Sequence, residues 1–130
     1  MAGKRKRALQ RSACPIANTL DLFGDKWTLI VIRDLIAGKR RYGEFQSSPE
    51  KIPSNILADR LRQLEQIAVI RKMPYQRRPV RYEYHLTEKG ADLLPILQAM
   101  TKWSGQHVAG SWTPPTWFEA LTPESLKRRK

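Results

Sequence analysis

One segment of the sequence, SNILADRLRQLEQ at residues 54–66, has a strongly amphipathic helical pattern. At about 100° per residue, its leucines fall on one side of a helix and its polar side chains on the other. The apolar side holds Leu57, Leu61, Leu64 and Ala68, and the polar side holds Asn55, Asp59, Arg62 and Gln66. Ser54 stands where it would cap this helix. The pattern predicts a helix with one core face and one face free for contacts.

Two short β-prone runs follow this helix directly, at residues 69–75 and 80–86. They enclose a Gln-Arg-Arg-Pro loop, which indicates an antiparallel hairpin. In the second run Tyr82, Tyr84 and Leu86 alternate with polar residues, so their side should pack inward. A helix that is followed at once by a hairpin leaves few fold classes open to this chain.

Helical patterns account for most of the remaining body. They predict a short helix that starts at Pro15, an apolar helix that Asp25 caps and Gly38 ends, and a shorter helix at residues 42–48. Thr87 is expected to cap a long closing helix. The apolar residues of that helix are Leu93, Leu94, Ile96, Leu97, Met100 and Trp103. Together they present more apolar surface than the core of one small domain can bury.

The predicted order is four helices, a hairpin and a long helix, which makes the chain mainly α with a small β-hairpin. This is the order of a winged helix-turn-helix domain. The helix at 42–48 would brace a recognition helix at 54–66, and the hairpin would form the wing. The domain would span residues 13–110, between a basic arm at 1–12 and a loosely held, proline-containing tail at 111–130.

Positive charge is concentrated on part of the chain. The formal net charge is +12, and residues 39–81 hold 11 basic and 4 acidic side chains, a net charge of +7. Such a face favours a polyanion as partner, and double-stranded DNA is the partner that a winged domain binds. No apolar run reaches the ~20 residues of a membrane span, and the start of the chain lacks the apolar centre of a secretory signal. We therefore expect a cytoplasmic protein with no membrane contact.

The basic loop and the polar helix face supply the candidate DNA contacts. Arg77, Arg78 and Arg81 would lie on the wing, where guanidinium groups can contact the DNA backbone or enter the minor groove. Asn55 and Arg62 are the best candidates for reading bases, because amide and guanidinium groups bind adenine and guanine bidentately. Phosphate contacts are expected from four further residues, Lys39, Arg40, Arg41 and Lys51.

Several motifs in the right order resemble the HxlR-type transcriptional regulators, which are related to the MarR-type winged-helix proteins. The motifs are Cys14-Pro15, GDKWTLIVIRDLIAGKRRYGEF at 24–45, LADRLRQLE at 57–65 and RYEYHLTEKGADLLPIL at 81–97. The resemblance covers about residues 14–108. It implies a homodimer held by its first and last helices and bound to an inverted-repeat operator as repressor or activator. It also places Ser54, Asn55, Asp59 and Arg62 on the DNA face of the recognition helix, and Gln76 to Arg81 in the wing.

The sequence departs from this family at the turn after the recognition helix. Where many members have an acidic residue and a glycine, this chain has Gln66-Ile67-Ala68. The turn must therefore form without the freedom of glycine at positive φ. The arm before Cys14 and the tail from Trp112 onward lie outside the resemblance, which implies no role for them.

Cys14 is the only cysteine, which excludes an intrachain disulfide and a multi-thiolate zinc site. A lone cysteine at a helix start is most often a small buried residue. The helix dipole and nearby Arg11 would instead favour a reactive thiolate. The resemblance adds that some similar regulators sense oxidants or electrophiles through a cysteine at this position, so both interpretations stay open.

Other functions have less support. His85 and His107 have no suitably spaced acid, nucleophile or second ligand, so we expect no enzyme activity, cofactor or metal. The runner-up function is non-specific nucleic-acid binding, architectural or RNA-directed, through the basic ends. A third class is a protein-interaction module that keeps the winged fold. Trp112 and Trp117 would either cover a dimer contact or line a pocket for a small-molecule effector.

Overall fold

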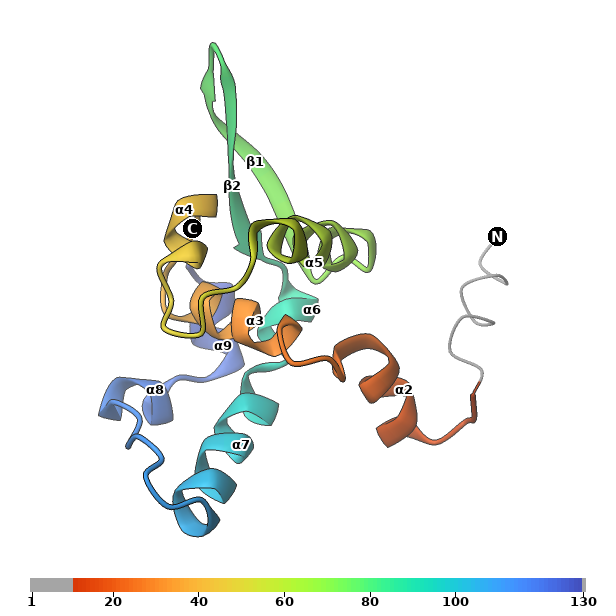
Figure 1. Ribbon diagram of the computed structural model, residues 1–130, viewed down its shortest axis with the longest axis vertical. Helices are drawn as coiled ribbons and strands as arrows, with labels where there is room; N and C mark the ends of the chain where they lie inside the picture. The colour runs from red at the N-terminus through yellow and green to blue at the C-terminus, as the bar shows by residue number, and fades with distance from the viewer. Residues whose placement is uncertain (1–10, 130) are drawn as a thin grey trace.

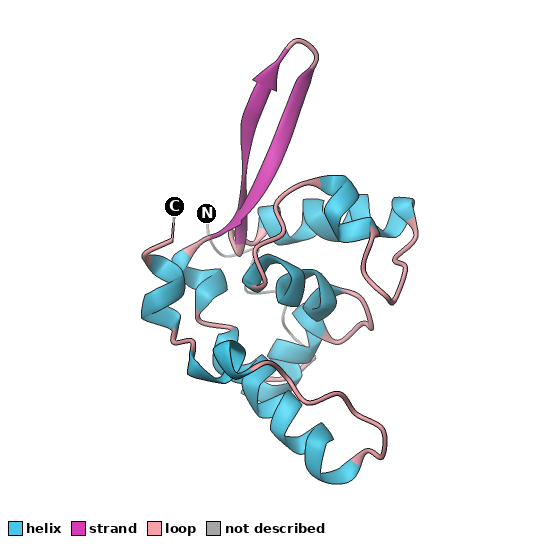
Figure 2. Cartoon of the chain, turned by 90° about the vertical axis from the view of Figure 1, so that its left-hand side faces the viewer, coloured by secondary structure: helices cyan, strands magenta, loops and turns pink. Residues whose placement is uncertain are grey.

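A computed structural model describes residues 11–129 of the chain (Figure 1). The elements are α2 (Pro15–Phe23), α3 (Thr28–Ile36), α4 (Tyr42–Gln46), α5 (Ser54–Gln66), β1 (Ile70–Arg77), β2 (Val80–Leu86), α6 (Glu88–Ala91), α7 (Leu94–His107), α8 (Thr116–Ala120) and α9 (Pro123–Lys127). The two antiparallel strands project from the helical body as a hairpin (Figures 1 and 2). The predicted fold class, mainly α with the hairpin of a winged helix-turn-helix, is confirmed. Residues 1–10 of the predicted basic arm lie outside the described residues.

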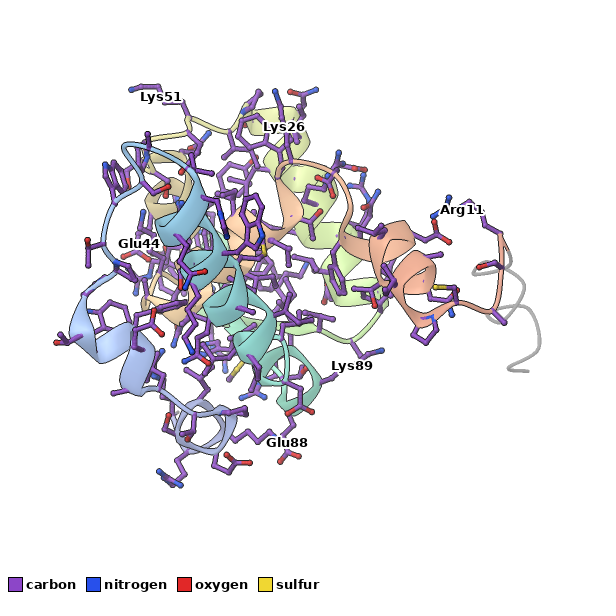
Figure 3. The ribbon with its side chains drawn as sticks, turned by 90° about the horizontal axis from the view of Figure 1, so that it is seen from below. Arg11, Lys26, Glu44, Lys51, Glu88 and Lys89 are labelled. Atoms are coloured by element: carbon purple, nitrogen blue, oxygen red, sulfur yellow. The ribbon has the colours of Figure 1, made fainter. Side chains whose placement is uncertain are left out.

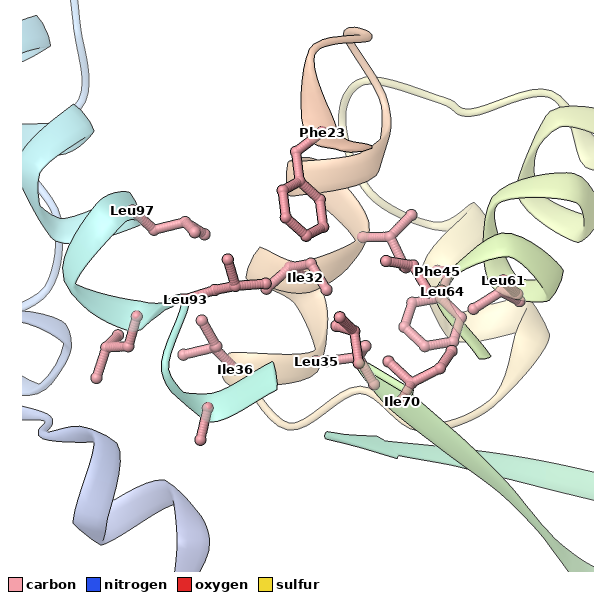
Figure 4. Close-up of a cluster of buried hydrophobic side chains, with 14 of the residues drawn as sticks. Phe23, Ile32, Leu35, Ile36, Phe45, Leu61, Leu64, Ile70, Leu93 and Leu97 are labelled. Atoms are coloured by element: carbon pink, nitrogen blue, oxygen red, sulfur yellow. The ribbon is translucent and has the colours of Figure 1, made fainter. Parts of the chain in front are cut away.

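Helices α3 and α5 form the centre of the hydrophobic core (Figure 4). Helix α3 contributes Val31, Ile32, Leu35 and Ile36, and α5 contributes Leu57, Leu61 and Leu64. The hairpin adds Ile70, and the segment between α6 and α7 adds Leu93. The predicted core face of α5 is confirmed for its three leucines, whereas Ala68, also predicted on that face, is exposed and lies after the helix. Because this face is buried against α3 and the hairpin, the opposite face of α5 stays in solvent.

Trp27 occupies the cap position of α3, but the carboxylate of Asp25, which was predicted to cap this helix, binds its first N–H groups. Its Oδ2 accepts hydrogen bonds from the backbone N–H of Trp27 at 3.0 Å and of Thr28 at 3.1 Å. The same oxygen accepts a 2.9 Å bond from Nε of Arg60 on α5. Burial opposes ionisation of Asp25, but the bonds from Thr28 and Arg60 outweigh it and lower the pKa to about 2. This carboxylate therefore ties the start of α3 to the recognition helix.

Two helix predictions need correction. Ser54 is the first residue of α5 rather than its cap, and Pro53 occupies the cap position without a side-chain hydrogen bond. Thr87 does cap a helix, since its Oγ1 accepts from the N–H of Gly90 at 3.1 Å, but that helix ends at Ala91. The chain starts a second helix at Leu94, with Pro95 in its first turn. Proline suits a helix start and cannot donate within a continuous helix, which explains the break.

Ala68 supplies the left-handed residue that the turn after α5 requires. Its φ is 63°. This conformation lets the N–H of Val69 donate to the carbonyl of Leu64 at 3.0 Å, which closes the end of α5. The carbonyl of Ala68 also accepts a 2.6 Å bond from Oγ1 of Thr87. The turn therefore keeps the geometry that favours glycine, at the cost of strain in an alanine.

Replacing Ala68 with glycine should raise the free energy of unfolding by about 0.5–1 kcal/mol, because relief of the left-handed strain exceeds the extra entropy of an unfolded glycine. Urea unfolding measures the change. Gln66→Gly, in the last turn of the same helix, is the matched control and should lower stability by up to about 1 kcal/mol. A loss of stability in Ala68→Gly would contradict this account of the turn.

The C-terminal tail packs against the body, contrary to the prediction of a loosely held segment. Phe118 of α8 and Leu126 of α9 are buried in the core. Nζ of Lys127 lies 3.0 Å from Oδ1 of Asp92, and Arg129 donates from Nη1 to the carbonyl of Ile36 at 2.7 Å. Pro115 lies at the cap position of α8, and Pro123 is the first residue of α9.

Candidate nucleic-acid interface

Helix α4 braces the recognition helix α5 through one tyrosine. The hydroxyl of Tyr42 donates to the carbonyl of Ser54 at 2.6 Å and lies 3.0 Å from its Oγ. Tyr42 therefore fixes the first turn of α5, and the buried leucines of α5 fix the rest of the helix against the core. Asn55 and Arg62 are both exposed, as expected for residues that could reach a ligand.

Asp59 organises the polar side chains on the exposed face of α5. Its carboxylate accepts from Nη2 of Arg62 at 2.8 Å and from Nε2 of Gln63 at 3.0 Å, and it also pairs with Arg60. The side chain of Arg62 is still 61% exposed. Asp59 therefore holds the side chain of Arg62, and its own predicted contact with DNA stays a prediction.

The tip of the hairpin carries free positive charge. Arg77, Arg78 and Arg81 are exposed, and within residues 11–129 none of them forms an ion pair. Gln76 is partly buried, and its Nε2 donates to the carbonyl of Pro79 at 2.9 Å. Gln76 therefore shapes the tip, and the three arginines extend from it. The hairpin rises beside α5, so both elements border the same side of the body (Figure 1).

Arg41 joins α4 to the hairpin. Its guanidinium carbon lies 3.6 Å from the centre of the Tyr75 ring, and its Nε donates to Oε2 of Glu83 at 3.2 Å. The side chain is still half exposed. Sequence reasoning missed Tyr75 and Glu83, because their contact with Arg41 joins residues far apart in the chain and leaves no periodic signal.

Two predicted phosphate contacts are used within the fold. Nζ of Lys39 donates to Oγ of Ser48 at 2.6 Å. Nη1 of Arg40 donates to the carbonyl of Leu35 at 3.0 Å and to that of Lys39 at 2.9 Å. Both side chains are partly buried. These internal bonds hold both side chains in place, and their contact with phosphate stays a prediction.

Lys51 is exposed and lies on one edge of the body. Figure 3 shows it on the same edge as Lys26, with Arg11 far away at the end of α2. Lys51 has a φ of 56°, in the left-handed region, within the loop between α4 and α5. Of the predicted phosphate contacts outside the hairpin, Lys51 and Arg41 are thus the exposed ones.

Cys14 is exposed at the cap position of α2. The interpretation of Cys14 as a small buried residue is therefore wrong. The thiol is accessible to a reagent, which leaves the second interpretation, a reactive cysteine, as a proposal.

The tail tryptophans line a cleft of about 610 Å³ between α3, α7 and the chain after α7. Trp112 and Trp117 form part of its wall, together with Leu29, Ile30 and Met100. Both tryptophans remain at least 47% exposed. This arrangement fits the predicted role of lining a pocket, and the role of covering a dimer contact stays a prediction.

Other kinds of site find no support in the part of the chain that is described. Across residues 11–129, no three His, Cys, Asp or Glu residues are grouped so that they could hold a metal ion. Among the same residues, no helix is both long and apolar enough to cross a membrane.

Comparison with known proteins places this geometry in a family. Residues 22–111 match the model of the HxlR-like helix-turn-helix family. YdeP from Bacillus subtilis (strain 168), an HTH-type transcriptional regulator, is 39% identical over 94 residues, which are 72% of this chain and 73% of YdeP. Rv3095 from Mycobacterium tuberculosis, another HTH-type regulator, is 33% identical over 77% of this chain, and the match spans only 63% of Rv3095.

Solved structures agree with this match. The reduced form of the redox regulator HypR has a TM-score of 0.68 and 34% identity, over 74% of this chain and 95% of HypR. The reduced form of the transcriptional regulator YodB from B. subtilis has a TM-score of 0.62 and 30% identity, over 78% of this chain and all of YodB. The chain belongs to the HxlR-like helix-turn-helix family of transcriptional regulators.

Proposed function

We propose that the chain acts as a homodimer that binds an inverted-repeat operator and controls transcription there. The observation that carries this proposal is the exposed polar face of α5 beside a projecting hairpin, whose three arginines form no ion pair within residues 11–129. The major groove of DNA admits one helix and displays a distinct pattern of donors and acceptors for each base pair. With α5 in that groove, the hairpin tip would reach the adjoining backbone or minor groove.

Exposed apolar side chains on α2 and α7 support the dimer. Ile16 and Leu20 of α2 are 72% and 56% exposed, and Trp103 of α7 is 62% exposed. Ile96 and Met100 extend the same side of α7. A second copy that covers these helices would remove apolar surface from water. Two recognition helices would then enter successive major grooves about 34 Å apart.

Arg62→Ala should weaken operator binding by about 1–3 kcal/mol and change binding to random DNA little, because only the operator offers a guanine at the matching position. Arg78→Ala should weaken both alike, since a phosphate contact carries no sequence information. Fluorescence anisotropy with labelled duplexes measures both. Equal losses for Arg62→Ala on the two DNAs would show that Arg62 does not read bases.

Selection of bound duplexes from a random pool at physiological salt tests the whole proposal. A two-fold symmetric consensus supports a sequence-specific dimer. Enrichment of no sequence would favour the runner-up function, non-specific binding through the basic ends. Truncation at residue 126 cannot separate the two, because Leu126 is buried. Deleting residues 1–10 and replacing Arg128 with glutamine removes terminal charge without cutting the core.

A response to oxidants is the finer proposal for Cys14. HypR is described as a redox regulator, and YodB has been solved in reduced and diamide-treated forms. The exposed thiol of Cys14 supports a similar response here. Diamide should then change operator affinity in the wild type and leave Cys14→Ser unaffected. Unchanged affinity after complete modification of the thiol would rule out the response.

The cleft beside Trp112 and Trp117 supports a small-molecule effector as the alternative. Its volume of about 610 Å³ lies in the range of ligand pockets, roughly 300–1,000 Å³. A ligand in this cleft should quench tryptophan fluorescence and shift operator affinity at the same concentration. Quenching without a shift in affinity would separate binding from regulation.

A further inference from the structure

Three arginines and a histidine surround a small cavity at the base of the hairpin. The cavity has a volume of about 20 Å³, and Arg40, Arg71, His85 and Arg129 line it together with leucines of α3, β2 and α9. Arg71 and His85 face each other across the two strands. Arg40 comes from the turn after α3, and Arg129 follows α9. Four separate parts of the chain therefore bring positive or titratable groups to one point.

Contacts with the backbone hold two of these guanidinium groups in place. Nη1 of Arg40 donates to the carbonyl of Leu35 at 3.0 Å, and Nη1 of Arg129 donates to the carbonyl of Ile36 at 2.7 Å. The backbone of Arg40 is held in turn, because its carbonyl accepts from the N–H of Tyr84 at 2.8 Å. A guanidinium group has five N–H donors, so each group keeps donors free for a further partner.

No carboxylate neutralises this cluster. Among the described residues, Arg40, Arg71 and Arg129 form no ion pair, whereas Arg33 and Arg60 each do. The C-terminal end of α3 offers about half a negative charge, against three full positive charges. Burial, and then the charge of Arg129, lower the pKa of Arg40, although Glu83 and Glu44 act in the opposite direction.

In a purely structural role, Arg40 and Arg129 would only cap the carbonyl groups at the end of α3. That role explains the two bonds to Leu35 and Ile36, but it explains neither Arg71 nor the cavity. Glu83, the nearest acidic residue on β2, pairs with Arg41 and lies 3.4 Å from His85, and it does not line the cavity. The cavity is therefore lined by positive charges and by no acidic residue among the described residues.

We propose that this cavity binds an oxyanion, with one oxygen of a phosphate group held between the guanidinium groups of Arg40, Arg71 and Arg129. A site needs about 10–15 Å³ to admit a water molecule, so a cavity of about 20 Å³ admits one oxygen while the rest of the phosphate lies at its mouth. Hydrogen bonds between guanidinium groups and phosphate are short and strong because both partners are charged. Arg129 lies beyond residues 22–111, the part that the family model matches.

The bound phosphate group can belong to a DNA backbone or to a free phosphate ion. Only the first case depends on the proposed function. The first arm of the test therefore omits DNA and titrates the full chain with inorganic phosphate by calorimetry, at an ionic strength held constant with chloride. We expect saturable binding of one phosphate per chain. Arg71→Gln and Arg129→Gln should each weaken it about tenfold, the loss of one charged hydrogen bond.

Arg128→Gln is the matched control, because it removes the same charge from the neighbouring exposed residue, which does not line the cavity. It should bind phosphate within about twofold of the wild type. Arg71 is exposed, so Arg71→Gln should fold even where Arg129→Gln does not, and far-ultraviolet circular dichroism checks both. The proposal is overturned if the wild type shows no saturable binding, or if Arg128→Gln loses as much affinity as Arg71→Gln.

The second arm measures binding to a short duplex in the presence of phosphate. If the occupant is a backbone phosphate of DNA, free phosphate competes with the duplex, and Arg71→Gln lowers the salt dependence of binding by about one phosphate contact per chain. If the occupant is a free ion, phosphate and duplex bind together, and the salt dependence stays unchanged. Failure to bind any duplex would contradict the proposed function. The phosphate titration would then still test the oxyanion site on its own.

Discussion

Replacing Phe45 with alanine should lower the free energy of unfolding by about 3–5 kcal/mol. Phe45 is fully buried and is the one buried residue of the five-residue helix α4. Its ring lies 6.3 Å from the ring of Tyr84 on β2, at an interplanar angle of 65°. Loss of the ring would leave a cavity where α4 and the hairpin meet. Because domains are stable by only about 5–15 kcal/mol, the change would remove a large share of the total.

Urea unfolding measures this loss, which should appear as a lower midpoint with an unchanged slope. Gly43→Ala on the same helix is the matched control. A methyl group there would meet nothing within 4 Å, and alanine favours the helix, so stability should stay equal or rise by up to about 1 kcal/mol. A loss below about 1 kcal/mol for Phe45→Ala would show that α4 does not depend on this ring.

The elements with a long periodic pattern could be predicted from the sequence. Helix α5 and strand β2 have the predicted bounds, because one face of each repeats apolar residues at a regular spacing. The closing helix was predicted as continuous, since the periodicity continues across the break that Pro95 introduces. Helices α8 and α9 have five residues each and bury one side chain apiece, Phe118 and Leu126. So short a pattern carries no periodic signal.

The candidate site follows the same division. The exposure of Asn55 and Arg62 follows from their side of a helix. The free charges of the hairpin tip follow from residues 76–81, which hold three arginines and no acid. Pairings between distant residues could not be predicted. Arg129 meets the end of α3 from 93 residues away, and only the folded tail brings it there. Sequence alone therefore could not show which basic side chains also form contacts within the fold.

Binding to an operator should weaken by about 10³-fold or more when the salt concentration rises from 50 to 200 mM. Each phosphate that a basic side chain neutralises releases condensed counterions, and six or more such contacts produce a loss of this size. Arg77, Arg78 and Arg81 carry charges that no acid in the described residues neutralises, and Arg41 and Lys51 are exposed as well. Anisotropy titrations at a series of salt concentrations give the slope of log affinity against log salt.

Replacing the three hairpin arginines with glutamine should reduce that slope by about five, because the proposed homodimer loses six phosphate contacts and each contributes about 0.9. Lys102→Gln is the control, because Lys102 is an exposed residue of α7, and α7 lies at the opposite end of the molecule from the hairpin (Figure 1). Its slope should match that of the wild type, since a charge far from DNA releases no counterion there. If the triple variant kept the wild-type slope, the hairpin would not lie on the DNA backbone, and α5 would have to bind without its wing.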